Sequence, residues 1–188
     1  MLKLTIDTNV RNRENLDRIS EAVRRLDVEI AATTVTIREQ GLQQTDEAVV
    51  CETGIWGESR WGESVWGPNP AVPETFVLDE SRLGNAALGG AESRSRFQAI
   101  LDVATNGSFP PPGKRNELSE PQRRQLRDAM ILQAHARDKR DILISNDVTF
   151  FGRPGSVLRE RLQRLCETRI VTVDEFCDFA RALAQQTV

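Results

Sequence analysis

Four carboxylates lie beside segments whose patterns predict strands or helices. Asp7 and Asp147 each follow an apolar run typical of a strand, while Glu39 and Asp128 lie in helical patterns. Ligands of open α/β sheets collect beyond the carboxyl ends of the strands, so we expect these side chains to meet there. Like charges brought together repel unless a cation compensates them. Carboxylate oxygens are preferred ligands of Mg²⁺ or Mn²⁺, and such ions can drive phosphodiester hydrolysis.

Histidine and cysteine, the other residue types that commonly act in catalysis or bind metals, are scarce in this chain. His135 is the only histidine, which excludes His-rich metal sites and makes a Ser-His-Asp triad depend on this one residue. It follows Asp128 by seven residues in a helical pattern, so it either approaches that face or is a packed or surface histidine. The three cysteines form no Cys-x-x-Cys pair, which argues against a disulfide framework or a structural zinc site.

The apolar periodicity predicts alternating strands and helices. Expected strands cover residues 2–6, 28–32, 142–145 and 170–172, and expected helices cover 13–26, a segment carrying Glu39, 120–138, 157–167 and 174–184. Ser119, with Gln122 three residues later, has the spacing of a capping box. This alternation predicts one α/β domain over residues 1–188 with a parallel sheet.

Residues 40–93 interrupt the alternation. The segment is acidic, contains all three tryptophans, and repeats itself, since residues 58–67 align with 80–89. We interpret it as an irregular or β-rich insertion. Its tryptophans either pack against the domain or form a docking or gating surface, because tryptophan is a strong interface anchor.

Basic side chains gather in the second half of the chain. Residues 1–110 hold 11 Lys/Arg and 17 Asp/Glu, whereas residues 111–188 hold 14 and 11. The second half could therefore face a polyanion, or its charges could be solvated helix faces. The candidate contacts to an RNA backbone are Lys114, Arg115, Arg123, Arg124 and Arg127. No signal-peptide layout or long apolar run is present, so we expect a cytoplasmic protein without a membrane partner.

Five segments, in this order, resemble the PIN domain family of ribonucleases. They are residues 4–10, 34–39, 128–134, 142–150 and 170–176, and the resemblance covers residues 1–39 and roughly 94–184. It implies a three-layer α/β/α sandwich with a central, mostly parallel sheet. Carried over by position, the catalytic and metal-binding residues are Asp7, Glu39, Asp128 and Asp147, with Asn9 and Ser145 in support.

The resemblance implies an endoribonuclease that uses Mg²⁺ or Mn²⁺ to cleave single-stranded or loop RNA, leaving a 5′-phosphate and a 3′-hydroxyl. A toxin-type member would have a protein inhibitor, an antitoxin, as partner, and a homodimer is a further alternative. Two features depart from the family pattern. Thr149 replaces a further acid found in many relatives, and the 40–93 insertion is far longer than in small members.

Two other functions remain as alternatives. The first is a non-catalytic interaction module of the same fold that binds a protein or RNA through the insertion. The second is a phosphatase of the haloacid dehalogenase type, which also begins with a strand and an aspartate. That class usually needs an acid two residues later, where this chain has Asn9, which cannot supply the proton.

Overall fold

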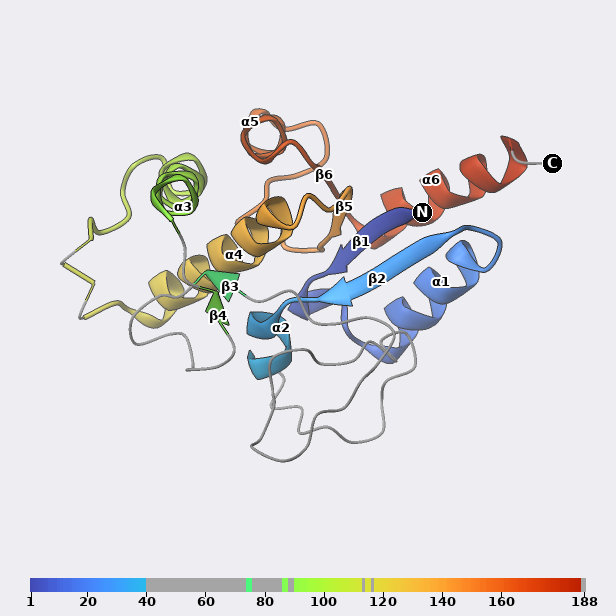
Figure 1. The fold of residues 1–188 in the computed structure, drawn as a ribbon, viewed down its shortest axis with the longest axis horizontal. Coiled ribbons are helices and arrows are strands. Elements are labelled where there is room, and N and C mark those ends of the chain that lie inside the picture. The colour runs from blue at the N-terminus through green and yellow to red at the C-terminus, as the bar shows by residue number, and fades with distance from the viewer. Residues whose placement is uncertain (40–73, 76–85, 88–89, 113, 116, 187–188) are drawn as a thin grey trace.

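A parallel sheet forms the centre of the structure, a computed structural model that describes residues 1–39, 74–75, 86–87, 90–112, 114–115 and 117–186. Its strands are β1 (Leu2–Ile6), β2 (Val28–Ala32), β5 (Ile142–Ile144) and β6 (Arg169–Val171). Their order is β2–β1–β5–β6, and each neighbouring pair is parallel (Figure 1). The expected α/β class is confirmed, and the four strands lie within about a residue of their predicted positions.

Helices connect and cover these strands. They are η1 (Thr8–Val10), α1 (Arg13–Val23), α2 (Thr34–Glu39), α3 (Ala91–Ala104), α4 (Glu120–Arg137), α5 (Val157–Cys166) and α6 (Val173–Gln186). The start of α4 has the expected capping box, in which the Ser119 amide donates to Gln122 Oε1 at 2.9 Å. Helix α1 ends earlier than predicted. The amide of Leu26 turns back to the Val23 carbonyl, while the Leu26 side chain still packs on the core.

Helix α3 was not predicted. It begins at Ala91, inside the segment interpreted as an insertion, and buries Phe97, Ile100 and Leu101. This buried stripe is about one turn long and follows a polar run of Ser and Arg at residues 93–96, so its periodicity is weak in the sequence. Of residues 40–90, the structure describes Glu74–Thr75 (β3) and Ala86–Ala87 (β4), which pair in parallel, and Gly90. The tryptophans lie outside the described residues, and so does the repeat apart from Ala86–Ala87 of its second copy.

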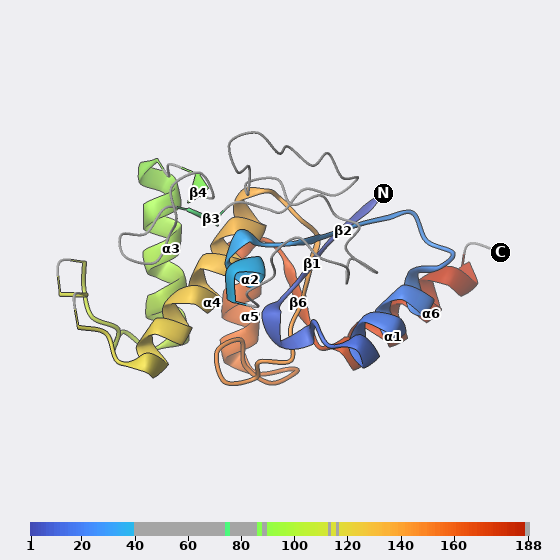
Figure 2. The ribbon, with the colours of Figure 1, turned by 90° about the horizontal axis from the view of Figure 1, so that it is seen from below.

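Alternate side chains of the strands enter two separate cores. Leu4 and Ile6 of β1 belong to a cluster that includes Ile19 of α1 and Phe176 of α6. Leu143 of β5 and Ile170 of β6 belong instead to a cluster with α3, α4 and α5. Figure 2 shows α1 beside α6, away from the group of α3, α4 and α5. The period of two in side-chain direction is what lets short apolar strands be buried on both faces.

Among the described residues, no helix has both the length and the apolar character needed to cross a lipid bilayer.

Candidate functional site

The sheet register brings two distant parts of the chain together. Ile6 of β1 is paired with Ile144 of β5, so the residues that follow them, Asp7 and Ser145, lie side by side beyond the strand ends. The Asp7 amide continues the ladder by donating to the Ile144 carbonyl at 3.1 Å. The carboxyl ends of the two central strands therefore carry the first candidate ligand and one of its expected supports.

Hydrogen bonds fix the buried carboxylate of Asp7, which is only 1% exposed. Its Oδ1 accepts from the Thr8 amide at 2.6 Å. Its Oδ2 accepts from the Ser145 hydroxyl at 2.6 Å and from Asn9 Nδ2 at 2.7 Å. Asn9 and Ser145, which the resemblance implied as supports of the acidic set, thus both contact the Asp7 carboxylate.

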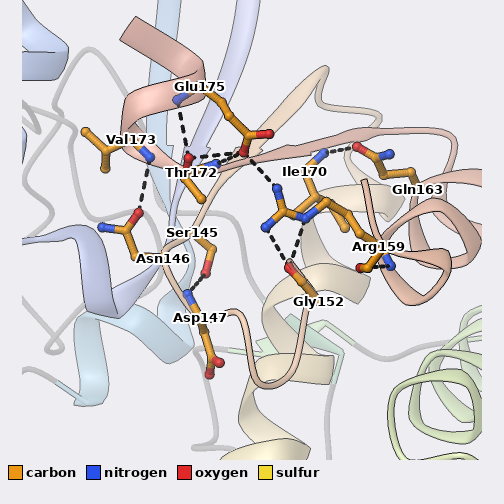
Figure 3. Close-up of polar contacts among 11 residues, drawn as sticks. Ser145, Asn146, Asp147, Gly152, Arg159, Gln163, Ile170, Thr172, Val173 and Glu175 are labelled. Atoms are coloured by element: carbon orange, nitrogen blue, oxygen red, sulfur yellow. Dashed lines mark hydrogen bonds and ion pairs between the residues drawn. The ribbon is translucent and has the colours of Figure 1, made fainter. Parts of the chain in front are cut away.

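Asp147 follows β5 and begins a tight turn. Its Oδ1 accepts from the Thr149 amide at 2.7 Å and the Phe150 amide at 3.0 Å. Its own amide donates to Ser145 Oγ at 3.0 Å, so the Ser145 hydroxyl connects Asp7 with Asp147. Figure 3 shows the Asp147 carboxylate pointing away from Ser145. Thr149, at the position of a further acid in the resemblance, contributes a backbone amide to this turn.

Glu39, at the end of α2, also reaches this region. Its Oε2 accepts from the Thr8 hydroxyl at 2.6 Å, directly beside Asp7. Its Oε1 lies 3.8 Å from Nη1 of Arg127 on α4. Helix α2 therefore brings a third carboxylate to the ends of the central strands, and α4 brings a cation.

The ionisation of Asp128 shows that it shares this environment. Burial, which is the largest cause, and the charges of Asp7, Asp147 and Glu39 together raise the pKa of Asp128 to about 9, while Arg127 opposes the rise. Each of the three other acids is therefore close enough to act on Asp128. A carboxyl group with this pKa is protonated at neutral pH.

The pKa of Asp7 is also raised, to about 6. Burial is the main cause, hydrogen bonds from Ser145 and Thr8 oppose it, and the charges of Glu39 and Asp147 add to it. The group of Asp7, Glu39, Asp128 and Asp147, called the acidic group below, thus holds more negative charge than Arg127 and the local hydrogen-bond donors compensate.

The acidic group has the donor chemistry of a site for a hard divalent cation, but not a finished coordination shell. All of its candidate ligand atoms are carboxylate oxygens, which suit Mg²⁺ or Mn²⁺. Yet within the described part of the chain, no three Asp, Glu, His or Cys side chains are arranged to hold a metal ion. Binding an ion there would require Asp128 to lose its proton and the carboxylates to turn toward a common point.

The five predicted RNA-binding residues have different surroundings. Arg115 donates to the Pro110 carbonyl at 2.9 Å and to Gln98 at 2.6 Å, so it supports its own loop. Arg124 pairs with Glu120 one turn earlier on the exposed face of α4. Arg127 lies against Glu39, next to the acidic group. Lys114 precedes α4 and Arg123 lies in its first turns.

His135 is a packed histidine. It is fully buried, and its ring nitrogens contact the hydroxyls of Thr5 in β1 and Thr168 before β6. Burial, followed by the charge of Arg140, lowers its pKa to about 3, so the ring is neutral. His135 does not approach the face of Asp128, because both ring nitrogens contact the threonine hydroxyls instead.

Sequence reasoning missed several residues that hold the site. The Asn146 amide donates to Asn9 Oδ1 at 2.9 Å, and Arg159 and Glu175 form an ion pair behind the turn of Asp147. One signal was present in the sequence: Thr172 and Glu175 have the three-residue spacing of a capping box. Nothing in the sequence pairs Glu175 with Arg159, because that contact depends on how α5 and α6 pack.

No family model matches the chain, and neither a curated protein nor a solved structure matches it significantly.

Proposed function

We propose that this protein is a PIN-like endoribonuclease that uses Mg²⁺ or Mn²⁺ at the acidic group to hydrolyse phosphodiester bonds of RNA in the cytoplasm. One observation carries the proposal. Four carboxylates from four separate parts of the chain gather at the carboxyl ends of the central strands. The Ser145 hydroxyl connects Asp7 with Asp147, and Glu39 accepts from Thr8 beside Asp7. The charges of these three acids all act on Asp128. Repulsion among ionised carboxylates at one site opposes folding unless a bound cation compensates their charge.

The proposed fold is a three-layer α/β/α sandwich. It is supported by the division of strand side chains between one cluster with α1 and α6 and another with α3, α4 and α5. The order β2–β1–β5–β6 places the first strand of the chain at the centre, so Asp7 lies where the sheet is buried on both sides.

The acidic group would hold the metal ion. When bound, the ion would lower the pKa of an attacking water and offset the charge that develops on the phosphate. Ser145 and Asn9 fix the Oδ2 atom of Asp7 by hydrogen bonds. The carboxyl group of Asp128 holds a proton at neutral pH and would give it up on metal binding. Arg127 supplies a positive charge beside Glu39 that could contact an RNA phosphate.

The alternative is a binding module of the same fold without catalysis, and one observation favours it. The described side chains do not form a ready-made metal site, and Asp128 is neutral at pH 7. In this case the carboxylates would be structural, and RNA or a protein partner, such as an antitoxin or a second copy of the chain, would be bound without turnover.

Cleavage of labelled single-stranded and hairpin RNA separates the two functions. We expect turnover with Mg²⁺ or Mn²⁺ that stops with EDTA. Asp7→Asn should abolish it while the circular dichroism spectrum stays unchanged. Asp17→Asn is a matched control, because Asp17 is an exposed carboxylate on α1, and this variant should keep full activity. Full activity of Asp7→Asn, or no metal-dependent turnover in the native protein, would reject the nuclease.

A further inference from the structure

Arg159 is a buried arginine whose Nε, Nη1 and Nη2 atoms all have hydrogen-bond partners. Its side chain is only 3% exposed. Nε and Nη2 donate to the Gly152 carbonyl at 3.0 and 2.6 Å, and Nη1 pairs with Glu175 Oε2 at 2.8 Å (Figure 3). Burying a guanidinium group is costly unless its partners are precisely placed. The contacts therefore hold a specific piece of backbone, the carbonyl of Gly152.

Gly152 ends the turn that begins at Asp147. Its φ of +81° favours glycine, and a Cβ atom there would lie 2.5 Å from Ser156 Oγ and 3.0 Å from the Arg159 amide. The backbone thus approaches the start of α5 more closely than any larger residue allows. This close approach puts the Gly152 carbonyl within reach of the Arg159 side chain.

The start of the turn is fixed by Asp147 itself. The Phe151 amide donates to the Asp147 carbonyl at 3.1 Å, and the Phe150 amide donates to Asp147 Oδ1 at 3.0 Å. Both phenylalanines are buried, with ring centroids 5.0 Å apart. The segment 147–152 is therefore one compact unit, with the Asp147 carboxylate at one end and the carbonyl held by Arg159 at the other.

Glu175 connects this unit to the start of α6. Its Oε2 accepts from the Thr172 amide at 2.8 Å as well as from Arg159. Two residues before Glu175, the Val173 amide donates to Asn146 Oδ1 at 3.2 Å. The beginning of α6 therefore holds the 147–152 segment from both sides, through Arg159 beyond its end and through Asn146 before its start.

We propose that Arg159, paired with Glu175, is a positioning residue that keeps the Asp147 carboxylate beside the other acids. It acts by clamping the Gly152 carbonyl, so the 147–152 segment cannot shift along α5. The consequence for metal affinity rests on the proposed function, whereas the effect on the turn does not.

The chain offers a matched control for this pair. Arg140 has a side chain that is 2% exposed, pairs with Glu29 at 2.6 Å, and donates to the Leu4 carbonyl at 2.8 Å. It is thus also a buried arginine bound to a glutamate and to backbone, with a further ion pair to Asp138 at 3.2 Å. It precedes β5, however, whereas Asp147 follows that strand.

The test compares Arg159→Lys and Glu175→Gln with Arg140→Lys. Amide hydrogen exchange by NMR reports the turn through the amides of Phe150 and Phe151, with Ile144 of β5 as the reference within each variant. We expect exchange of the two turn amides to quicken at least about tenfold relative to Ile144 in both test variants. The dissociation constant for Mn²⁺, from electron paramagnetic resonance, should rise about tenfold, as for other residues that orient metal ligands. Arg140→Lys should change neither quantity.

The outcomes separate this inference from the proposed function. Unchanged relative exchange at Phe150 and Phe151 in both test variants would overturn the positioning role, even if the native protein binds Mn²⁺. Equal acceleration of all amides would also overturn it, since that indicates a purely global effect on stability. If the native protein binds no Mn²⁺ but the turn amides respond as expected, the proposed function fails and the positioning of Asp147 holds. Glu175→Gln keeps an oxygen acceptor, so it remains informative if Arg159→Lys does not fold.

Discussion

The hydroxyl of Ser145 donates a 2.6 Å hydrogen bond to Oδ2 of Asp7, although the two residues are 138 positions apart in the sequence. The Oγ atom of Ser145 also accepts a hydrogen bond from the Asp147 amide. One hydroxyl group thus connects both carboxylates that follow the central strands. It also helps Asp7 to stay ionised despite burial, because its hydrogen bond lowers the pKa of that carboxyl.

Replacing Ser145 by alanine should weaken metal binding. Loss of the hydroxyl removes a group that orients Asp7 and stabilises its charge, so the pKa of Asp7 should rise further. We expect the dissociation constant for Mn²⁺ at pH 7 to increase about tenfold, as measured by electron paramagnetic resonance. Ser108→Ala, which removes a hydroxyl bound to the Thr105 carbonyl, is the control and should bind Mn²⁺ normally. Equal affinities in both variants would contradict this role of Ser145.

The metal-free protein should become less stable as pH rises from 6.5 to 8. The pKa of Asp128 is about 9 in the folded protein and near 3.8 when unfolded, so unfolding releases its proton throughout this range. The stability due to this neutral carboxyl is complete below pH 3.8 and is lost as pH rises toward 9. The expected loss is up to about 1.4 kcal/mol per pH unit. Asp7 contributes little here, because its folded pKa of about 6 lies below this range. His135 acts in the opposite direction, because its pKa is about 3 when folded and near 6.5 when unfolded, but it offsets less than about 0.5 kcal/mol over this range.

Urea unfolding in EDTA at several pH values measures this dependence. Asp128→Asn removes the titrating group, so its free energy of unfolding should be nearly constant between pH 6.5 and 8. Asp102→Asn, on α3, should retain the native slope. The same slope in Asp128→Asn and the native protein would show that Asp128 is not the group responsible.

Binding of Mn²⁺ or Mg²⁺ at pH 7 should release about one proton. A metal ligand must be deprotonated, and Asp128 holds its proton at this pH in the metal-free protein. Calorimetric titration in buffers of different ionisation enthalpy measures the number of protons released. Asp128→Asn should bind with no such release. Heats that do not depend on the buffer in the native protein would mean that Asp128 is already ionised or does not contact the ion.

His135→Ala should reduce stability without changing metal binding. The substitution leaves a cavity and removes the ring that contacts the buried hydroxyl of Thr5 and the partly buried hydroxyl of Thr168. We expect a loss of about 2 to 4 kcal/mol in the free energy of unfolding, measured in urea. The affinity for Mn²⁺ should stay within twofold of the native value. A large loss of affinity at unchanged stability would place His135 at the site instead.

The strands and the long helices could be predicted because each has a local signal. The apolar runs 2–6 and 142–145 had to be buried strands, and Ser119 with Gln122 marked the start of α4. Helix α3 could not, since its buried stripe of Phe97, Ile100 and Leu101 is short and is recognised as a core face only after it packs on α4 and α5.

The sequence could place each acidic residue relative to its own strand or helix, but it could not show how close these residues come to one another. A strand pattern places Asp7 and Asp147 after their strands, whereas the pairing of Ile6 with Ile144 decides that they become neighbours. The contact of Arg159 with the Gly152 carbonyl could not be predicted from the sequence, for a similar reason. It depends on Arg159 in α5 meeting Glu175 in α6, and the packing of two helices is not encoded in the spacing of either.

Anomalous X-ray scattering from crystals grown with Mn²⁺ locates the ion without any assumption about activity. We expect one strong peak among the carboxylates of Asp7, Glu39, Asp128 and Asp147, with oxygen ligands from at least two of them, and no peak there in crystals of Asp7→Asn. A peak on another face of the molecule, or none at the acidic group at saturating Mn²⁺, would contradict the metal site on which the proposed nuclease depends.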